Sequence, residues 1–320
     1  MRMNVVLVFA SVVLYACGPA VTDDPFNGDS PDGAPGQADA RQSPNEFADA
    51  APPEACSKMD ILFVIDDSGS MSEEQSNLAS NFPAFINVIN NYVNQSGDAL
   101  DYRIGITTTG RDLNYTISVG GISLPFSESG DNGALRQGSG MTRRWLERND
   151  PNAASTFASV AQVGTGGPSI EMPLLAVDWA LNDRVADGTN AGFLRDDALL
   201  ALVILTDEDD CSREDNNFTI SSDACTPNTP PQVHTVDSYI SMLDTVKGER
   251  GRWATAVIAG PSSCTSDFGD AIEATRLKQF VADTGENAVF SSICNGDLSS
   301  ALQDALDTFS AACESFPPIP

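Results

Sequence analysis

The sequence predicts an α/β protein with a doubly wound, mostly parallel sheet flanked by helices. Two stretches of strand length end in an aspartate: residues 59–66 (MDILFVID) are nearly all apolar, and residues 198–207 (ALLALVILTD) form a continuous apolar run. Such runs are typical of parallel strands that are buried on both faces. Strand-like and helix-like patterns alternate from residue 56 to residue 313, which indicates parallel strands joined by crossover helices.

The first predicted helix follows the first strand and covers residues 72–93. Residues 72–75 (SEEQ) match a capping box, and they place two glutamates near the positive end of the helix dipole. Apolar side chains then recur at helical spacing. Pro83 is expected either to kink this helix or to mark a restart.

The later elements are predicted from the same patterns. Residues 115–126 (YTISVGGISLPF) predict an edge hairpin, and the remainder of residues 110–160 is irregular and favours loop. The other predicted strands cover residues 101–109, 251–260 and 287–293. The other predicted helices cover residues 171–181, 270–283 and 298–313.

The N-terminus has the pattern of an export signal. A positive charge at Arg2 precedes a short apolar run in residues 5–16. A membrane-spanning helix needs about 20 such residues, so the run is too short to span. Residues 14–17 (LYAC) resemble the lipobox of bacterial lipoproteins. This resemblance implies cleavage before Cys17 and a lipid on its thiol; ordinary secretion with Cys17 incidental is the alternative.

We therefore expect four segments along the chain. Residues 1–16 form a lipoprotein signal peptide, and residues 17–55 form a disordered tether rich in Asp, Pro, Gly and Ala. Residues 56–314 form the folded domain, and residues 315–320 form a tail. Gly18 follows the cysteine where the inner-membrane retention signal of enteric bacteria has Asp, so the expected location is the outer membrane.

Composition excludes several classes of function. The chain has 45 acidic and 17 basic residues, a formal net charge of −28, which disfavours nucleic-acid binding. The acidity indicates either solubility or an acidic patch for one partner. His234 is the only histidine, and no nucleophile elbow or phosphate-binding loop occurs, so we expect no enzyme and no zinc site.

Polar residues cluster where predicted strands end. Asp66, Ser68 and Ser70 follow the first strand at DxSxS spacing, and Asp207 ends the later strand in VILTDEDD. Ligands of doubly wound sheets bind at these carboxyl ends. Thr165 lies on a glycine-rich loop before a predicted helix. The alternative interpretation of the DxSxS stretch is a turn that only caps a helix.

Together these elements resemble a von Willebrand factor type A domain with its metal-ion-dependent adhesion site, over about residues 56–313. The resemblance implies that Ser68 and Ser70 bind Mg²⁺ or Mn²⁺ directly, with Thr165 direct or nearly so. Asp66 and Asp207 would act through bound water. Other hydroxyl residues of the same irregular region are alternatives to Thr165, namely Thr142, Thr156 and Ser169.

The metal chemistry explains why hydroxyls and carboxylates gather here. Mg²⁺ takes oxygen ligands in octahedral geometry, and hydroxyls quench little of its charge. In the family, a carboxylate of a partner then takes an open position on the metal. The expected function is a surface-tethered module that recognises a protein or peptide ligand through this metal. The alternative is a structural cell-envelope lipoprotein whose metal only stiffens the fold. Residues 208–210 are expected to form a solvated loop.

Six cysteines remain apart from Cys17, and an even number in an exported protein predicts three disulfides. The sequence alone leaves 15 pairings open. On the frame that the resemblance implies, we expect the pairs Cys56–Cys313, Cys211–Cys225 and Cys264–Cys294.

Overall fold

A six-stranded sheet forms the centre of the protein. The computed structural model describes residues 56–93, 97–220, 234–266, 269–296 and 298–317. The strands of the central sheet are β1 (Lys58–Ile65), β2 (Asp101–Thr108), β5 (Trp145–Glu147), β6 (Leu199–Leu205), β8 (Trp253–Ala259) and β11 (Ala288–Ser292). Their order is β11–β8–β6–β1–β2–β5, and every neighbouring pair is parallel except β2 with β5.

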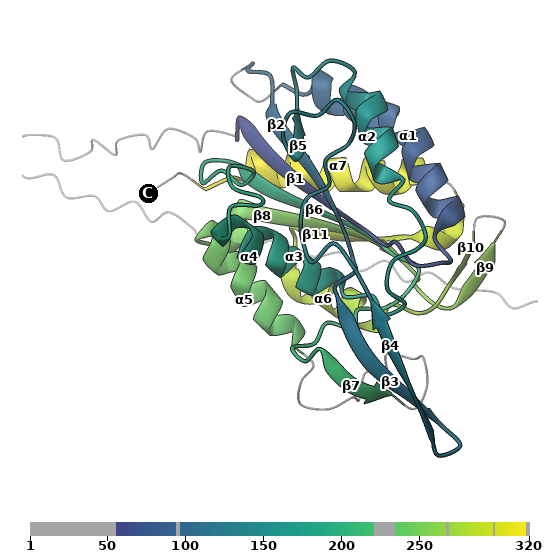
Figure 1. The fold of residues 1–320 in the computed structure, drawn as a ribbon. Helices are drawn as coiled ribbons and strands as arrows, with labels where there is room; N and C mark the ends of the chain where they lie inside the picture. Colours follow the sequence, from purple (N-terminus) through teal and green to yellow (C-terminus); the bar gives the residue numbers. More distant parts are fainter. Residues whose placement is uncertain (1–55, 94–96, 221–233, 267–268, 297, 318–320) are drawn as a thin grey trace, which may run out of the picture. The chain divides into compact units, whose positions relative to one another are not determined.

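Helices cover both faces of the sheet (Figure 1). One core lies beneath α1 (Ser72–Asn91), α2 (Ala153–Ala161) and α7 (Leu298–Glu314), and the other beneath α3 (Pro173–Leu181), α5 (Val236–Lys247) and α6 (Thr275–Thr284). Along β1, Phe63 belongs to the first core and Leu62 to the second, so the strand is buried on both faces. The predicted fold class is confirmed. No helix in the described residues is long and apolar enough to cross a membrane.

The short elements are α4 (Asp183–Ala186), 3₁₀ turns at Arg250–Arg252 and Ile293–Asn295, and the strands β9 (Cys264–Ser266) and β10 (Gly269–Ala271). The helix predicted from residue 270 begins only at Thr275, because residues 269–271 pair with β9 instead. A helix restart at Pro83 is wrong, since α1 runs through this residue without interruption. The irregular region contains α2 and β5, which the sequence patterns did not predict.

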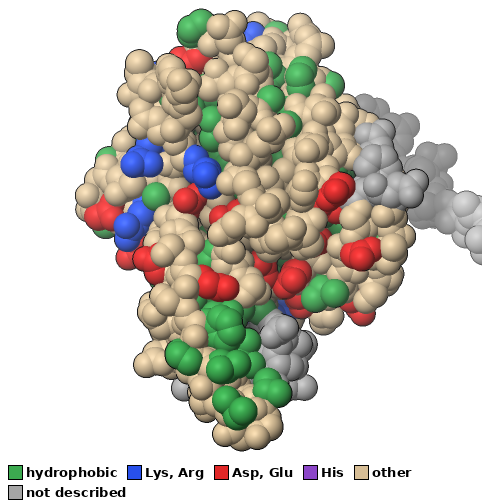
Figure 2. All heavy atoms as spheres, turned by 45° about the vertical axis from the view of Figure 1, so that its right-hand side comes forward, with side chains coloured by type: hydrophobic (Ala, Val, Ile, Leu, Met, Phe, Trp, Pro, Cys, Tyr) green, Lys and Arg blue, Asp and Glu red, His purple; other side chains and the backbone are tan. Residues whose placement is uncertain are grey.

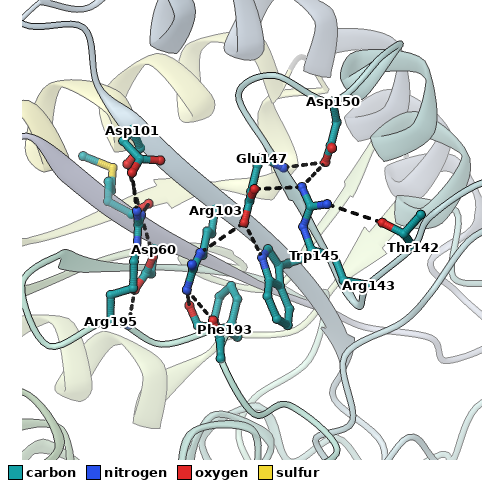
Figure 3. Close-up of polar contacts among 12 residues, drawn as sticks. Asp60, Asp101, Arg103, Thr142, Arg143, Trp145, Glu147, Asp150, Phe193 and Arg195 are labelled. Atoms are coloured by element: carbon teal, nitrogen blue, oxygen red, sulfur yellow. Dashed lines mark hydrogen bonds and ion pairs between the residues drawn. The ribbon is translucent and has the colours of Figure 1, made fainter.

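Aromatic and ionic contacts hold β5 at the edge of the sheet. Arg103 on β2 forms an ion pair with Glu147 and lies over the ring of Trp145, 5.4 Å from its centroid (Figure 3). The Trp145 Nε1–H donates to Glu147 Oε1 at 3.0 Å. These side-chain contacts stabilise β5, because a three-residue strand forms few backbone hydrogen bonds with β2.

The predicted hairpin exists, but it is not the edge of the central sheet. Strands β3 (Leu113–Val119) and β4 (Ile122–Glu128) pair through a turn at Gly120 and Gly121, both with positive φ, and β7 (Asn217–Ile220) joins them in a separate sheet. Figure 2 shows hydrophobic side chains gathered on this hairpin. The most exposed of them are Val119, Ile122, Leu124 and Phe126.

Two of the predicted disulfides are present, Cys56–Cys313 and Cys264–Cys294. The first joins the start of the described domain to the end of α7, where the Cys56 N–H also donates to the Cys313 carbonyl at 2.9 Å. Cys211 is also disulfide-bonded. Cys225 lies outside the described residues, as do the predicted signal peptide, Cys17 and the tether.

Candidate metal centre

The predicted site lies where the direction of chain progression across the sheet reverses. From β1 the chain passes to β2 on one side, and later returns to β6 on the other side of β1. This is the switch point at which doubly wound sheets bind their ligands. Asp66 directly follows β1, and its backbone N–H donates to the Leu205 carbonyl at the end of β6. The two acidic loops are therefore side by side.

Asp66 is fully buried, and both of its oxygens are held in place. Oδ1 accepts a hydrogen bond from the Ser68 backbone N–H at 2.7 Å, and Oδ2 accepts one from the Thr206 hydroxyl at 2.6 Å. The Glu208 N–H in turn donates to the Thr206 oxygen at 3.1 Å. Thr206 was not singled out in the sequence, although it precedes Asp207 in the same strand-end motif.

The hydroxyl groups of the DxSxS stretch lie beside Asp207. Ser68 Oγ and Ser70 Oγ are 3.2 Å apart, and the Ser70 side chain is close enough to Asp207 to lower the pKa of that carboxyl against the effect of burial. Asp207 Oδ1 is buried without a hydrogen-bond partner among the described residues. The structure thus brings together four of the five predicted site residues, namely Asp66, Ser68, Ser70 and Asp207.

Gln75 fastens the glycine-rich loop to the loop after β1. Its side-chain Nε2–H₂ donates to the carbonyls of Asp66 and Gly164, both at 2.8 Å, and its Oε1 accepts from the Gly164 N–H at 3.1 Å. The predicted capping box is wrong: Met71 is the N-cap of α1, and no side chain caps it. Gln75 is instead a clamp between two loops that are far apart in the sequence.

Thr165 lies on the clamped loop with its side chain exposed. A second contact, from the Gly167 N–H to the Asp67 carbonyl at 2.8 Å, holds the other side of the loop. A Cβ at residue 167 would lie 2.2 Å from the Asp67 carboxyl carbon, so only glycine fits there. Thr165 is therefore at the correct end of the sheet, but no hydrogen bond in the described residues joins it to the four grouped residues.

The alternative hydroxyl residues have other surroundings. Thr142 and Thr156 line a cavity of about 130 Å³ beside β5, together with Trp145. The Ser169 hydroxyl bonds the Glu128 carboxylate and Tyr115 at the base of the hairpin. Thr165 remains the hydroxyl residue whose loop is tied to Asp66.

Two of the acidic residues after Asp207 have structural roles. Asp209 accepts hydrogen bonds from the backbone N–H groups of Arg276 and Leu277 in the first turn of α6. Asp210 is fully buried, accepts from the Leu174 N–H in the first turn of α3, and pairs with the Arg276 guanidinium at 3.1 Å. The expectation of a solvated loop is wrong for both, because each satisfies donors at a helix start.

Burial makes the site electrostatically unbalanced. It raises the pKa of Asp66 to about 7, with the nearby Asp207 adding to the effect and the Thr206 hydrogen bond opposing it. Burial likewise raises the pKa of Asp207 to about 6 and that of Glu74 to about 7. Among the described residues, no lysine or arginine forms an ion pair with any of these three carboxylates.

These observations test whether a hard divalent cation fits. In the described part of the chain, no group of three or more His, Cys, Asp and Glu side chains is arranged to hold a metal. The predicted site is of a different kind, because three of its five residues are hydroxyl residues. In the described ranges, the unpartnered Asp207 oxygen, the adjacent serine hydroxyls and the lack of a compensating basic side chain fit an oxygen-liganded cation.

The raised pKa values predict an unusual pH dependence of the metal-free protein. A carboxyl whose folded pKa is raised binds protons more tightly in the native state, so it supports folding at low pH. With Asp66 at about 7 and Asp207 at about 6, stability falls as pH rises from about 4 to 7. We expect urea unfolding in EDTA to give a lower free energy at pH 8 than at pH 5, by roughly 2–4 kcal/mol.

Added Mg²⁺ is expected to remove most of this difference, because the cation replaces the lost protons. The same titration of Asp207→Asn provides the control, since one raised carboxyl is then absent. A free energy of unfolding that rises between pH 5 and pH 8 in EDTA would contradict the raised pKa values of Asp66 and Asp207.

Comparison with known proteins gives only distant structural likenesses. No protein-family model and no curated protein matches the sequence. Proximal thread matrix protein 1 from the mussel byssus is 11% identical over 81% of this chain and 49% of that protein, with a TM-score of 0.40. The pilus adhesin SpaC from Lactobacillus rhamnosus GG is 13% identical over 82% of this chain and 31% of the adhesin, also at 0.40.

Manganese-loaded TRAP protein of Plasmodium vivax is 13% identical over 79% of this chain and 74% of that protein, at a TM-score of 0.35. This chain spans about half of the mussel protein and about a third of the adhesin. At these scores the likenesses carry no argument about function, which rests on the residues of the site itself.

Proposed function

We propose that residues 56–314 form a von Willebrand factor type A module that recognises a protein or peptide ligand through Mg²⁺ or Mn²⁺. One observation carries this proposal. At the switch point of the sheet, the hydroxyls of Ser68 and Ser70 lie 3.2 Å apart, next to a buried Asp207 oxygen that has no partner in the described residues. A capped turn requires one such side chain and leaves the others without a role.

Each residue has a distinct part in this proposal. Ser68 and Ser70 supply neutral oxygen ligands, and Thr165 supplies a third from its clamped loop. Asp66 and Asp207 contribute negative charge and hold ordered water. Bound Mg²⁺ would offer a coordination position to a carboxylate oxygen of the partner. The hydrogen bonds of Thr206 and Gln75 hold the loop after β1, the loop after β6 and the glycine-rich loop in their relative positions without a ligand.

We propose that the module is carried on the outer membrane by a lipid on Cys17 and a tether of residues 17–55. The lipobox-like residues 14–17 support the anchor. The disulfides Cys56–Cys313 and Cys264–Cys294 support export, because such bonds persist in oxidising compartments. Mass spectrometry of the N-terminal peptide from a bacterial membrane fraction tests the anchor: an unmodified Cys17 would contradict it.

The metal site is tested by calorimetric titration of Mg²⁺ and Mn²⁺ into the chelator-treated full chain. We expect saturable binding at one site and loss of that binding in Ser68→Ala/Ser70→Ala, because both direct ligands are removed. The matched control is Ser118→Ala/Ser123→Ala, which removes two hydroxyl residues that face each other across the hairpin. No binding by the unmodified chain, or equal binding by the double-serine variant at the site, would overturn the proposal.

A further inference from the structure

Glu171 is a buried acidic residue that forms no ion pair with a lysine or arginine among the described residues. Its side chain is 1% exposed, and neither carboxylate oxygen has a hydrogen-bond partner among the described residues. Burying an unpaired carboxylate costs several kcal/mol, so native proteins pair such groups, place them against a cation or keep them protonated. The position of Glu171 therefore requires an explanation.

The backbone places Glu171 over the carboxyl end of β1. Its carbonyl accepts a hydrogen bond from the Cys211 N–H, in the loop after β6, at 2.8 Å. The next residue, Met172, donates to the Thr109 carbonyl at the end of β2, at 3.2 Å. Because β2 and β6 are the two neighbours of β1, this segment bridges across the end of β1, from which Asp66 emerges.

The charged neighbours of Glu171 are acidic. Burial raises the pKa of Glu171 well above its usual value, and the negative charge of Asp66, a side-chain contact with the carboxyl of Glu208 and the charge of Glu208 add to the effect. Arg276, which contacts the loop after β6, is already engaged by Asp210. Among the described residues no lysine or arginine pairs with Glu171.

A helix-capping role for Glu171 is also excluded by the contacts present. Glu171 lies just before α3, where a carboxylate commonly accepts from free backbone N–H groups. Those donors are already used, since the Leu174 N–H donates to Asp210 Oδ1 at 3.0 Å and the Leu175 N–H to Ser212 Oγ at 2.9 Å. The carboxylate of Glu171 is left with no donor to cap.

We propose that Glu171 supports the cation site from beside Asp66, where its negative charge strengthens the attraction for the divalent cation while the hydroxyl groups remain the direct ligands. This inference rests on the proposed function, and it adds an acidic group that the DxSxS pattern does not contain. The cation would supply the positive charge that the protein does not provide at Glu171. A site with this third carboxylate binds Mg²⁺ and Mn²⁺ more tightly than one built from the hydroxyls and two aspartates alone.

The test is calorimetric titration of Mg²⁺ and Mn²⁺ into Glu171→Gln, which keeps the shape of the side chain and removes its charge. We expect cation affinity to fall about 10- to 100-fold, the range seen when supporting groups of metal sites are replaced. Glu171→Asp, which keeps the charge, is expected to retain part of the affinity. Melting in EDTA is expected to be unchanged or higher for Glu171→Gln, because an unpaired buried charge is gone.

Glu147→Gln is the matched control, because it removes one negative charge near the opposite end of β2. Equal affinity of Glu171→Gln and the unmodified chain, or a decrease no larger than that of Glu147→Gln, would overturn the proposal. A purely structural role would lower melting in EDTA and leave cation affinity unchanged. Loss of binding in Ser68→Ala/Ser70→Ala with full binding in Glu171→Gln would reject Glu171 alone, whereas no binding by the unmodified chain would reject the metal site itself.

Discussion

Asp60→Ala is expected to lower the free energy of unfolding by about 3–5 kcal/mol, because it leaves a largely buried guanidinium without its partner. Asp60 on β1 is fully buried. Its Oδ2 accepts from the Arg195 backbone N–H at 2.6 Å, and its Oδ1 accepts from the Arg195 Nε–H at 2.8 Å (Figure 3). The same guanidinium donates to Asp101 Oδ2 at 2.7 Å.

The network ties three segments at the amino end of the central strands. Arg195 also donates to the carbonyls of Met59 and Asp101, so the loop before β6 is bonded to both β1 and β2. Burial raises the pKa of Asp60 despite the opposing charge of Arg195. Removal of Asp60 leaves the Arg195 guanidinium desolvated without its partner, and removal of Arg195 leaves the Asp60 carboxylate in the same condition.

Urea unfolding of Asp60→Ala measures the effect, and Lys58→Ala is the matched control on the same strand. Lys58 pairs with Asp197 at the surface, where both side chains are more than a third exposed. Such pairs contribute less than about 1 kcal/mol. Equal destabilisation by the two variants would show that the buried network does not hold the strand ends. Mg²⁺ affinity of folded Asp60→Ala is expected to be unchanged, because Asp60 lies at the opposite end of β1 from Asp66.

The second large effect is expected from the double variant Cys56→Ala/Cys313→Ala. The bond spans 257 residues, so it restricts the unfolded chain across the described domain. On the loop-entropy model its loss costs about 5 kcal/mol, against about 3–4 kcal/mol for a bond that closes a short loop. Cys264→Ala/Cys294→Ala provides that comparison, because its separation is 30 residues.

Thermal and urea unfolding of the two variants, without reductant, give the order of the effects. We expect the Cys56 and Cys313 variant to be the less stable, with its loss appearing first at the contact between β1 and α7. The reverse order would indicate that strain or residual structure in the unfolded state, and not loop length, sets the contribution of each bond.

The central strands and their terminal aspartates were predictable from local sequence. β6 is a continuous apolar run and β1 is apolar from Ile61 to Ile65, and the DxSxS spacing identifies the residues that gather at their ends. The two described disulfides followed from the order of the elements. These features depend on local sequence or on the order of the elements, so they can be predicted without knowing which side chains are in contact.

The residues that were missed act through contacts between distant segments. Gln75 fits a capping box locally, yet its partners lie 9 and 89 residues away. Asp209 and Asp210 appear as a run of surface charge, but each is occupied at the start of a helix elsewhere in the chain. Glu171 carries no motif at all. Its distinguishing property is burial without a basic partner among the residues that the structure describes, which only the folded arrangement reveals.

The position of β1 also determines how the module would carry mechanical load. A pull applied between residue 56 and the loop after β1 acts along the length of this strand, which is hydrogen-bonded to β2 on one side and β6 on the other. The bonds of both ladders are then loaded together in shear and must fail together. The Cys56–Cys313 bond transfers part of the force to α7 just before the start of β1. The rate of forced unfolding would be set by this one strand.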